Sequence, residues 1–172
     1  QCYPPKNIPL KIVLQLKTKN TTAIAKETTS KVAETKSEGL ATARPEDKTI
    51  DFDFVDFNGK PRKLSEFRGK YVLLDFWATW CKPCLADIPK LKELYEKYQS
   101  KDFEIIGMDA ETIGDEEGET DPEFAKETAE RARNIVKTRG VTWTQATNDS
   151  AVPVGKKLFD VKALPTKILI DK

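Results

Sequence analysis

Two cysteines separated by two residues are the groups in this sequence best placed for redox chemistry. Cys81 and Cys84 stand in WCKPC, between the apolar run YVLLDFW of residues 71–77 and a segment with apolar side chains at helical spacing. At the start of a helix, unpaired amides and the helix dipole favour a thiolate. We therefore expect Cys81 to attack disulfides. Cys84 lies one helical turn further on, less exposed, and is expected to resolve the mixed disulfide.

The residues beside the two cysteines fit this chemistry. Lys82 places a cation next to the Cys81 thiolate, and Pro83 is tolerated in a first helical turn because its missing N–H has no partner there. A static disulfide, or two ordinary thiols, is the alternative interpretation of such a pair. Its position between a buried strand and an amphipathic helix favours the redox interpretation.

Two acids near the cysteines are candidates for proton transfer. Asp75 falls inside the apolar run, six residues before Cys81, where burial is expected to raise the pKa of its carboxyl group. Asp87 follows Cys84 by one helical turn. Either carboxylate is a candidate to accept the proton of the Cys84 thiol. For Asp75 the alternative is a buried acid that is merely hydrogen-bonded, and for Asp87 a purely structural acid.

Neighbouring aromatic and proline residues have simpler expected roles. Trp77 is expected to pack in the core, whereas Trp80, adjacent to Cys81, is expected to contact substrate. Pro89 removes the helical hydrogen bond to the carbonyl group of Leu85, so a kink is expected there.

Strands and helices alternate along the chain from residue 50 onward. Alternating apolar and polar residues open this region, and Asn58-Gly59 predicts a turn. The pattern then predicts, in order, a strand at 71–77, a helix at 85–98, a strand at 103–109, a helix at 123–140, a short strand at 141–147, a short helix at 154–161 and a strand at 166–170. Such alternation implies a parallel sheet with right-handed crossovers.

The composition excludes several classes of function. A net charge of +1 gives no overall field that would recruit nucleic acid or an anionic membrane, and no apolar run approaches the roughly 18 residues of a membrane span. Three cysteines and no histidine exclude a Cys/His zinc site made by this chain alone. Covalent haem needs a histidine where Leu85 stands. We expect no metal and no organic cofactor.

Three regions differ in composition. Residues 1–17 resemble the end of a preceding segment, which leaves room for an upstream domain or anchor; residues 18–48 predict a flexible linker, and residues 49–172 one folded domain. Cys2 is interpreted as an incidental thiol, with a lipid-anchor cysteine as the alternative. The eight acids of residues 109–123 predict a solvated, mobile insertion, because they lack the spacing of an EF-hand calcium loop.

The segment VLLDFWATWCKPCLADIP resembles the active site of the thioredoxin superfamily, in particular the TlpA/ResA-type bacterial thiol-disulfide oxidoreductases. FVDFNGKPRKLSEFRGK is similar to that family's lead-in, and ALPTKILID to the segment that carries its cis-proline. The resemblance implies a thioredoxin-like α/β fold, with a central mixed sheet flanked by helices. It also implies that Cys81 attacks, Cys84 resolves, and Asp75 or Asp87 transfers protons. The implied substrate contacts are Trp80, Lys82, Pro83, Leu164 and the cis-proline Pro165.

The function implied by this resemblance is the reduction of protein disulfides outside the cytoplasm, in the periplasm or cell envelope. The implied partners are protein thiol or disulfide substrates and an upstream dithiol electron donor, with the disulfide of Cys81 and Cys84 as the only redox group. A peroxiredoxin is one alternative, since the lead-in is shared, but Ala78 stands where those proteins have threonine. A thioredoxin-like module that only binds partners, or an inactive fragment, is the other.

The chain stops where thioredoxin-like domains continue into one more antiparallel strand and a helix. The expected fold therefore lacks the final strand and the C-terminal helix. Strand 166–170 is then expected to lie at the edge of the sheet with open hydrogen-bonding groups, as in a fragment of a longer protein.

Overall fold

The computed structural model describes residues 10–13, 50–115 and 121–172. The predicted linker at 18–48 and Cys2 lie outside this part of the chain. The strands are β1 (Leu10–Val13), β2 (Asp53–Val55), β3 (Pro61–Lys63), β4 (Tyr71–Trp77), β5 (Phe103–Asp109), β6 (Thr144–Ala146) and β7 (Thr166–Ile170). The helices are the 3-10 helix η1 (Leu64–Phe67) and the α-helices α1 (Lys82–Tyr98), α2 (Pro122–Thr138) and α3 (Asn148–Phe159). No helix within these ranges is long and apolar enough to cross a membrane.

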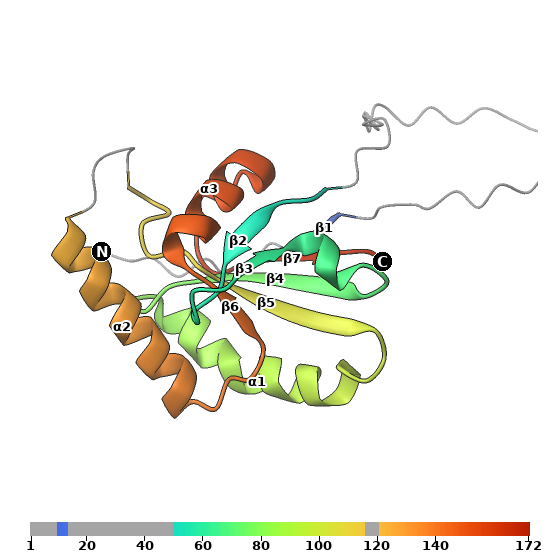
Figure 1. Cartoon of the computed structure of the whole chain (residues 1–172). Coiled ribbons are helices and arrows are strands. Elements are labelled where there is room, and N and C mark those ends of the chain that lie inside the picture. Colours follow the sequence, from blue (N-terminus) through green and yellow to red (C-terminus); the bar gives the residue numbers. More distant parts are fainter. Residues whose placement is uncertain (1–9, 14–49, 116–120) are drawn as a thin grey trace, which may run out of the picture. The chain divides into compact units, whose positions relative to one another are not determined.

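Five strands form a mixed sheet in the order β1-β7-β4-β5-β6 (Figure 1). Strands β4, β5 and β6 are mutually parallel, while β7 runs antiparallel to β4. This arrangement confirms the predicted mixed sheet flanked by helices. The N-terminal strands β2 and β3 form a separate antiparallel hairpin, whose turn is made by Asn58-Gly59 as predicted, with Gly59 at a φ of 77°.

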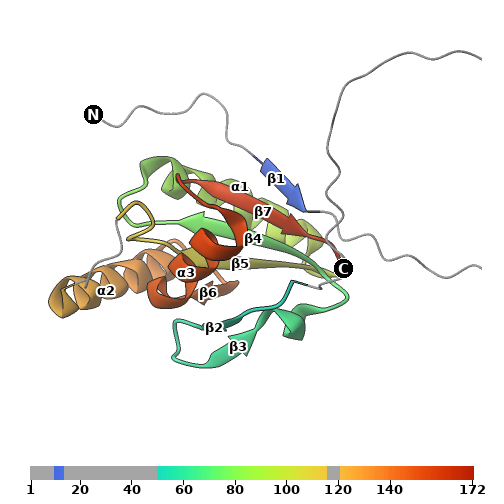
Figure 2. The same ribbon diagram turned by 90° about the horizontal axis from the view of Figure 1, so that it is seen from above.

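Strand β7 does not lie at the edge of the sheet, so this sequence-based expectation was wrong. Residues Leu10–Val13 pair with it in parallel, in the register that places Leu10 opposite Lys167 and Val13 opposite Ile170 (Figure 2). Residues 1–17, which include this strand, were interpreted as the end of a preceding segment. Its partner is a strand about 155 residues further along, a pairing that local sequence patterns do not reveal.

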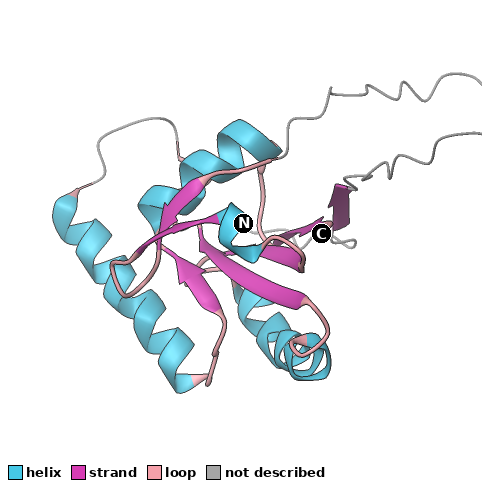
Figure 3. Cartoon of the chain, turned by 45° about the vertical axis from the view of Figure 1, so that its right-hand side comes forward, coloured by secondary structure: helices cyan, strands magenta, loops and turns pink. Residues whose placement is uncertain are grey.

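The central strand β4 separates two packed faces, as its apolar run predicted. Leu73 and Trp77 face helices α1 and α2, in core clusters with Leu91 and Ala132. Phe76, on the opposite face, lies against α3, where a Cβ added at Gly155 would come within 2.9 Å of its ring. Figure 3 shows the helices on both sides of the sheet. A polar group on the α1 side of β4 is therefore enclosed between the sheet and α1.

Helix α3 begins at Asn148, two turns before the predicted short helix at 154–161. Thr147 has extended backbone angles at the N-cap, and the helix continues through Pro153. The polar start and the internal proline concealed these turns from the sequence pattern, because proline is unfavourable inside a helix. Helix α2 ends close to the predicted point, with Gly140 at a φ of 61° just beyond it.

Candidate active site

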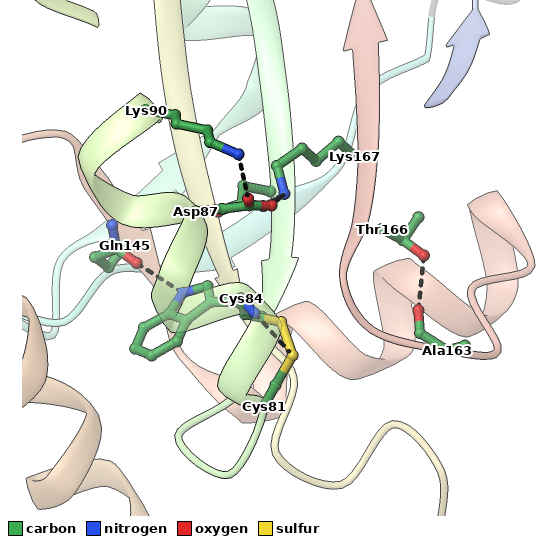
Figure 4. A network of polar contacts seen from close by, with 10 residues as sticks. Cys81, Cys84, Asp87, Lys90, Gln145, Ala163, Thr166 and Lys167 are labelled. Atoms are coloured by element: carbon green, nitrogen blue, oxygen red, sulfur yellow. Dashed lines mark hydrogen bonds and ion pairs between the residues drawn. A yellow bond between two sulfur atoms is a disulfide. The ribbon is translucent and has the colours of Figure 1, made fainter. Parts of the chain in front are cut away.

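A disulfide joins Cys81 and Cys84 at the N-terminal end of helix α1 (Figure 4). The Cα atoms lie 5.3 Å apart. Cys81 is the N-cap residue, and its Sγ accepts a hydrogen bond from the backbone N–H of Cys84 at 3.3 Å. Pro83 occupies the first turn, as predicted, where its missing N–H leaves no carbonyl unpaired. A thiolate at Cys81 would therefore be favoured by the helix dipole and by this N–H.

Exposure does not distinguish the two cysteines in the disulfide form. Each is 3% exposed, so the predicted lower exposure of Cys84 is not observed. Their difference lies in position: Cys81 caps the helix, whereas Cys84 is within its first turn. Lys82 and Pro83 between them are exposed. The surface beside Cys81 is thus open to a partner along the edge formed by these two residues.

Behind the disulfide, the buried Asp75 and the half-buried Asp87 share one lysine. The Nζ of Lys167 lies 3.2 Å from Oδ1 of Asp75 and donates a hydrogen bond to Oδ2 of Asp87 at 2.9 Å. Asp75 comes from β4, Asp87 from α1 and Lys167 from β7, so three elements meet here. Figure 4 shows Asp87 and Lys167 pointing toward each other. The structure confirms that Asp75 is buried in the strand and brings it together with Asp87. Lys167 was not among the predicted site residues, although a cation inside the otherwise apolar strand TKILI is an unusual feature that could have indicated it.

Burial governs the protonation of this cluster. Loss of solvation raises the pKa of the Asp75 carboxyl group, as predicted, and the charge of Lys167 opposes that rise. Burial also acts to lower the pKa of Lys167, but the nearby Asp75 and Asp87 outweigh it and raise this pKa. Among the described residues, Oδ1 of Asp75 makes the ion pair with Lys167 at 3.2 Å and accepts no other polar contact. This carboxylate oxygen has an unused lone pair for a proton.

The segment before β7 supplies the second wall of the site. The peptide bond between Leu164 and Pro165 is cis, which confirms the family-based prediction. Leu164 packs against the core cluster that contains Cys81 and Cys84. The loop is held by a hydrogen bond from Thr166 Oγ1 to the carbonyl of Ala163 at 2.7 Å. Of the predicted substrate-contact residues, Leu164 therefore packs against the cluster that contains the disulfide, and Pro165 follows it directly in the chain.

The two tryptophans differ as predicted in their surroundings. Trp77 is buried and donates from Nε1 to Oε1 of Gln145 at 3.0 Å. Trp80 is 55% exposed, and its Nε1 donates to the backbone carbonyl of Glu111 at 3.0 Å. Trp77 thus serves packing. Trp80 presents a fixed apolar face next to Cys81, and its role in substrate contact stays a prediction.

Two acids of the segment 109–123 are buried, Asp109 and Glu111, so its prediction as a solvated insertion was wrong for that part. Asp109, at the end of β5, is 1% exposed, and Oδ1 has no hydrogen-bond partner within the described ranges. Burial, reinforced by the charge of Glu111, raises the pKa of Asp109 to about 8. Glu111 is also buried and accepts hydrogen bonds from the backbone N–H and the hydroxyl of Thr79. It anchors the segment that leads from β4 to Cys81.

A CxxC disulfide at the start of the helix that follows a central strand, beside a cis-proline, defines a thioredoxin-like protein. Residues 45–172 match the AhpC/TSA family. The chain therefore belongs to the AhpC/TSA family.

Curated proteins similar to this chain are named thiol-disulfide oxidoreductases. It is 37% identical over 121 residues to the thiol-disulfide oxidoreductase ResA of Bacillus thuringiensis subsp. konkukian, covering 70% of this chain and 60% of the relative. The ResA of Bacillus subtilis is 30% identical over 120 residues, which cover 70% and 58% of the two chains. The chain thus spans about 60% of the length of the curated relatives it matches.

Solved structures give the same result for the fold. The thioredoxin domain of a thiol-disulfide oxidoreductase from Bacteroides vulgatus aligns with a TM-score of 0.55 and 25% identity, over 71% of this chain and 77% of that one. A Chlorobium tepidum protein assigned as thiol:disulfide interchange protein DsbE aligns with a TM-score of 0.55 and 30% identity, over 73% and 76% of the two chains. These similarities confirm the thioredoxin-like fold predicted from the sequence.

Proposed function

We propose that this protein is a thiol-disulfide oxidoreductase that reduces disulfides of protein substrates. The observation that carries the proposal is the disulfide of Cys81 and Cys84 at the N-terminus of α1, with the buried Asp75 on the adjoining strand face. The similar proteins named thiol-disulfide oxidoreductase support the same activity. The chemistry uses only the two sulfur atoms and acid-base side chains of this chain.

The proposed reaction has two exchange steps. The Cys81 thiolate attacks one sulfur of a substrate disulfide, forming a mixed disulfide and releasing the other substrate sulfur as a thiolate, which takes up a proton. The Cys84 thiol then loses its proton to a carboxylate, and its sulfur attacks Sγ of Cys81. This second attack forms the Cys81–Cys84 disulfide and releases the remaining substrate sulfur as a thiolate, which takes up a proton. Two electrons have passed from the protein dithiol to the substrate, and an upstream dithiol donor restores the reduced state.

The surroundings of the disulfide indicate how a substrate would bind. We propose that a substrate segment lies across the exposed face of Trp80 and the cis-proline segment at Leu164 and Pro165, next to Cys81. Lys82 and Pro83 form the adjoining exposed edge. We further propose that the protein acts outside the cytoplasm, as its resemblance to TlpA/ResA-type proteins implies.

Single cysteine variants test the proposed function. Cys84→Ser should complete the first step only, so a mixed disulfide with a protein substrate should accumulate and be released by reductant. Cys81→Ser should trap none, because the remaining thiol lies within the helix. Non-reducing electrophoresis and mass spectrometry of the trapped species provide the measurement. If neither variant traps a partner and the intact protein does not reduce insulin, the proposal is wrong.

A peroxide consumption assay separates the peroxiredoxin alternative. Ala78, at the place of the peroxiredoxin threonine, is fully buried and offers no hydroxyl group to a peroxide. We expect no consumption of hydrogen peroxide above that of ordinary thiols. Rapid turnover of peroxide that depends on Cys81 would favour the interpretation of this protein as a peroxiredoxin.

A further inference from the structure

We propose that Lys167 is a positioning residue that holds Asp75 and Asp87 in one network and keeps the Asp75 carboxylate in the form that accepts the Cys84 proton. This inference rests on the proposed function and adds to it a residue outside the CxxC motif. It stands on the two contacts of the Lys167 ammonium, 3.2 Å from Asp75 and 2.9 Å from Asp87.

The strand register fixes this geometry. In the antiparallel pairing of β4 with β7, Asp75 and Lys167 are directly opposite each other, so their side chains point to the same face of the sheet. That is the face of Leu73 and Trp77, which pack against α1 and the cysteines. On the other side of Asp75 the register partner is Gly107 of β5, which has no side chain. Of the two cross-strand neighbours of Asp75, only Lys167 therefore has a side chain that can contact its carboxylate.

The charges around Asp75 come from two elements. Helix α1 contributes Asp87, one turn after Cys84, and Lys90, whose Nζ lies 3.9 Å from Oδ1 of Asp87. Strand β7 contributes Lys167. Two acids so close together repel, and this repulsion together with burial opposes the ionised form of Asp75. Lys167 is the cation that counteracts both effects, because Lys90 contacts only Asp87 and its side chain is 82% exposed.

The position of Lys167 also connects the network to the substrate side of the site. It follows Pro165 by two residues, and the loop between Ala163 and Thr166 is fixed by its own hydrogen bond. The proposed substrate-contact segment at Leu164 and Pro165 thus leads directly into the strand that carries Lys167. Methionine in place of Lys167 would leave the strand intact but remove the charge.

The test separates the two exchange steps in a single experiment. The reduced protein is mixed with Ellman's reagent in a stopped-flow instrument; the attack of Cys81 releases one thionitrobenzoate, and the attack of Cys84 releases the second. The rate of each phase is recorded between pH 5 and 9. Lys167→Met should leave the first phase within about twofold of the intact protein, because no contact joins Lys167 to Cys81. The second phase should shift to higher pH by about one unit or more, the effect of losing an opposite charge at this distance.

Two further variants distinguish positioning from simple structural support. Lys167→Arg retains the charge and should restore at least half of the shift. Lys90→Met removes the neighbouring exposed cation and should shift the second phase by less than about 0.3 unit, because surface charges are screened by water. If the second phase of Lys167→Met has the pH profile of the intact protein, or if Lys167→Arg fails to restore it, the proposal is wrong.

The design remains decisive if Lys167→Met does not fold. In that case Asp75→Asn is compared with the double variant Asp75→Asn/Lys167→Met, in which no unpaired buried carboxylate remains at position 75. The proposal expects the pH profiles of the second phase in these two variants to differ by less than about half of a pH unit. A further shift of a full pH unit in the double variant overturns the proposal. A different result identifies failure of the proposed function itself: the intact protein then releases no second thionitrobenzoate at any pH.

Discussion

Arg139 donates a hydrogen bond from Nη1 to the carbonyl oxygen of Leu85 at 3.0 Å. This is the carbonyl that loses its helical partner because Pro89 has no N–H. The cost of the proline within α1 is therefore reduced by a side chain just beyond the end of α2. Lys92 of α1 donates in return to the backbone carbonyl of Arg139 at 3.2 Å, so the two helices are joined here in both directions.

The first prediction concerns this contact. Arg139→Met should lower the free energy of unfolding by about 0.5 to 1.5 kcal/mol, the net worth of a typical hydrogen bond. In a Pro89→Ala background the same change should cost less, since an alanine at position 89 donates its own N–H to Leu85. Urea denaturation of the four proteins measures the coupling, with the exposed Lys126→Met as control. Equal costs in both backgrounds would show that Arg139 does not serve the Leu85 carbonyl.

The second prediction concerns the pH dependence of stability. The pKa of Asp109 is raised by burial from 3.8 to about 8, so the folded protein holds this proton more tightly than the unfolded chain. The stabilisation is fully present below about pH 4 and is lost as the pH rises to about 8. Asp109→Asn should remove this part of the dependence and raise stability at pH 8 by a few kcal/mol.

Thermal denaturation at pH 5 and pH 8 provides the measurement for Asp109. The control is Glu130→Gln, which neutralises an exposed acid on α2. The intact protein and the control should lose stability between the two pH values, whereas Asp109→Asn should lose less. Parallel curves for all three proteins would show that Asp109 is ionised in the folded state.

The sequence predicted best those elements whose signal is local. Strands β4 and β5 were predicted at their exact bounds, because each is a mainly apolar run flanked by charged or turn-forming residues. The disulfide site was also predicted, since both cysteines and the start of the helix lie within one short segment. Helix α3 was predicted only in its second half, because Pro153 and the polar residues before it obscure the helical pattern.

Features that depend on distant pairing were not predicted. Lys167 is an ordinary charged residue in its own strand and acquires its place only when β7 pairs with β4. Asp109 was predicted at the end of the strand 103–109, but its side chain was interpreted with the acids that follow it as solvated; in the sheet it lies opposite Trp77. In both cases the charged residue type indicated a solvent-exposed side chain, whereas the register of the sheet places the side chain in the protein interior.

The third prediction concerns the packing of Gly107 against Gln145, the hydrogen-bond partner of Trp77. A methyl group at Gly107 would overlap the side-chain amide of Gln145, which accepts the hydrogen bond from Trp77. Gly107→Ala should therefore destabilise the protein by about 1 to 3 kcal/mol and release the indole N–H. Gln145→Ala in the same chain should recover part of that loss by removing the overlap. Near-ultraviolet circular dichroism and urea denaturation check both effects, and a Gly107→Ala protein with unchanged stability would contradict the prediction.

The fourth prediction separates the two candidate acids at the disulfide. Among the described residues, Oδ1 of Asp75 has one polar contact, the ion pair with Lys167, whereas the two oxygens of Asp87 face both Lys167 and Lys90. A base needs a free lone pair and is favoured by a pKa nearer to that of the thiol, which burial gives to Asp75. Asp75→Asn should therefore slow the resolving step by about 100-fold near pH 7, and Asp87→Asn by less than about tenfold.

The measurement for these acids is the second release of thionitrobenzoate from Ellman's reagent, with the first release as an internal control for the reactivity of Cys81. Asn has nearly the same shape as Asp, so both variants should keep the fold, which thermal denaturation verifies. The rate of the Asp75→Asn protein should rise with pH until hydroxide or water replaces the missing base, while the intact protein levels off earlier. If Asp87→Asn is the slower variant, the proton passes to the acid on the helix, and Asp75 serves only as the buried partner of Lys167.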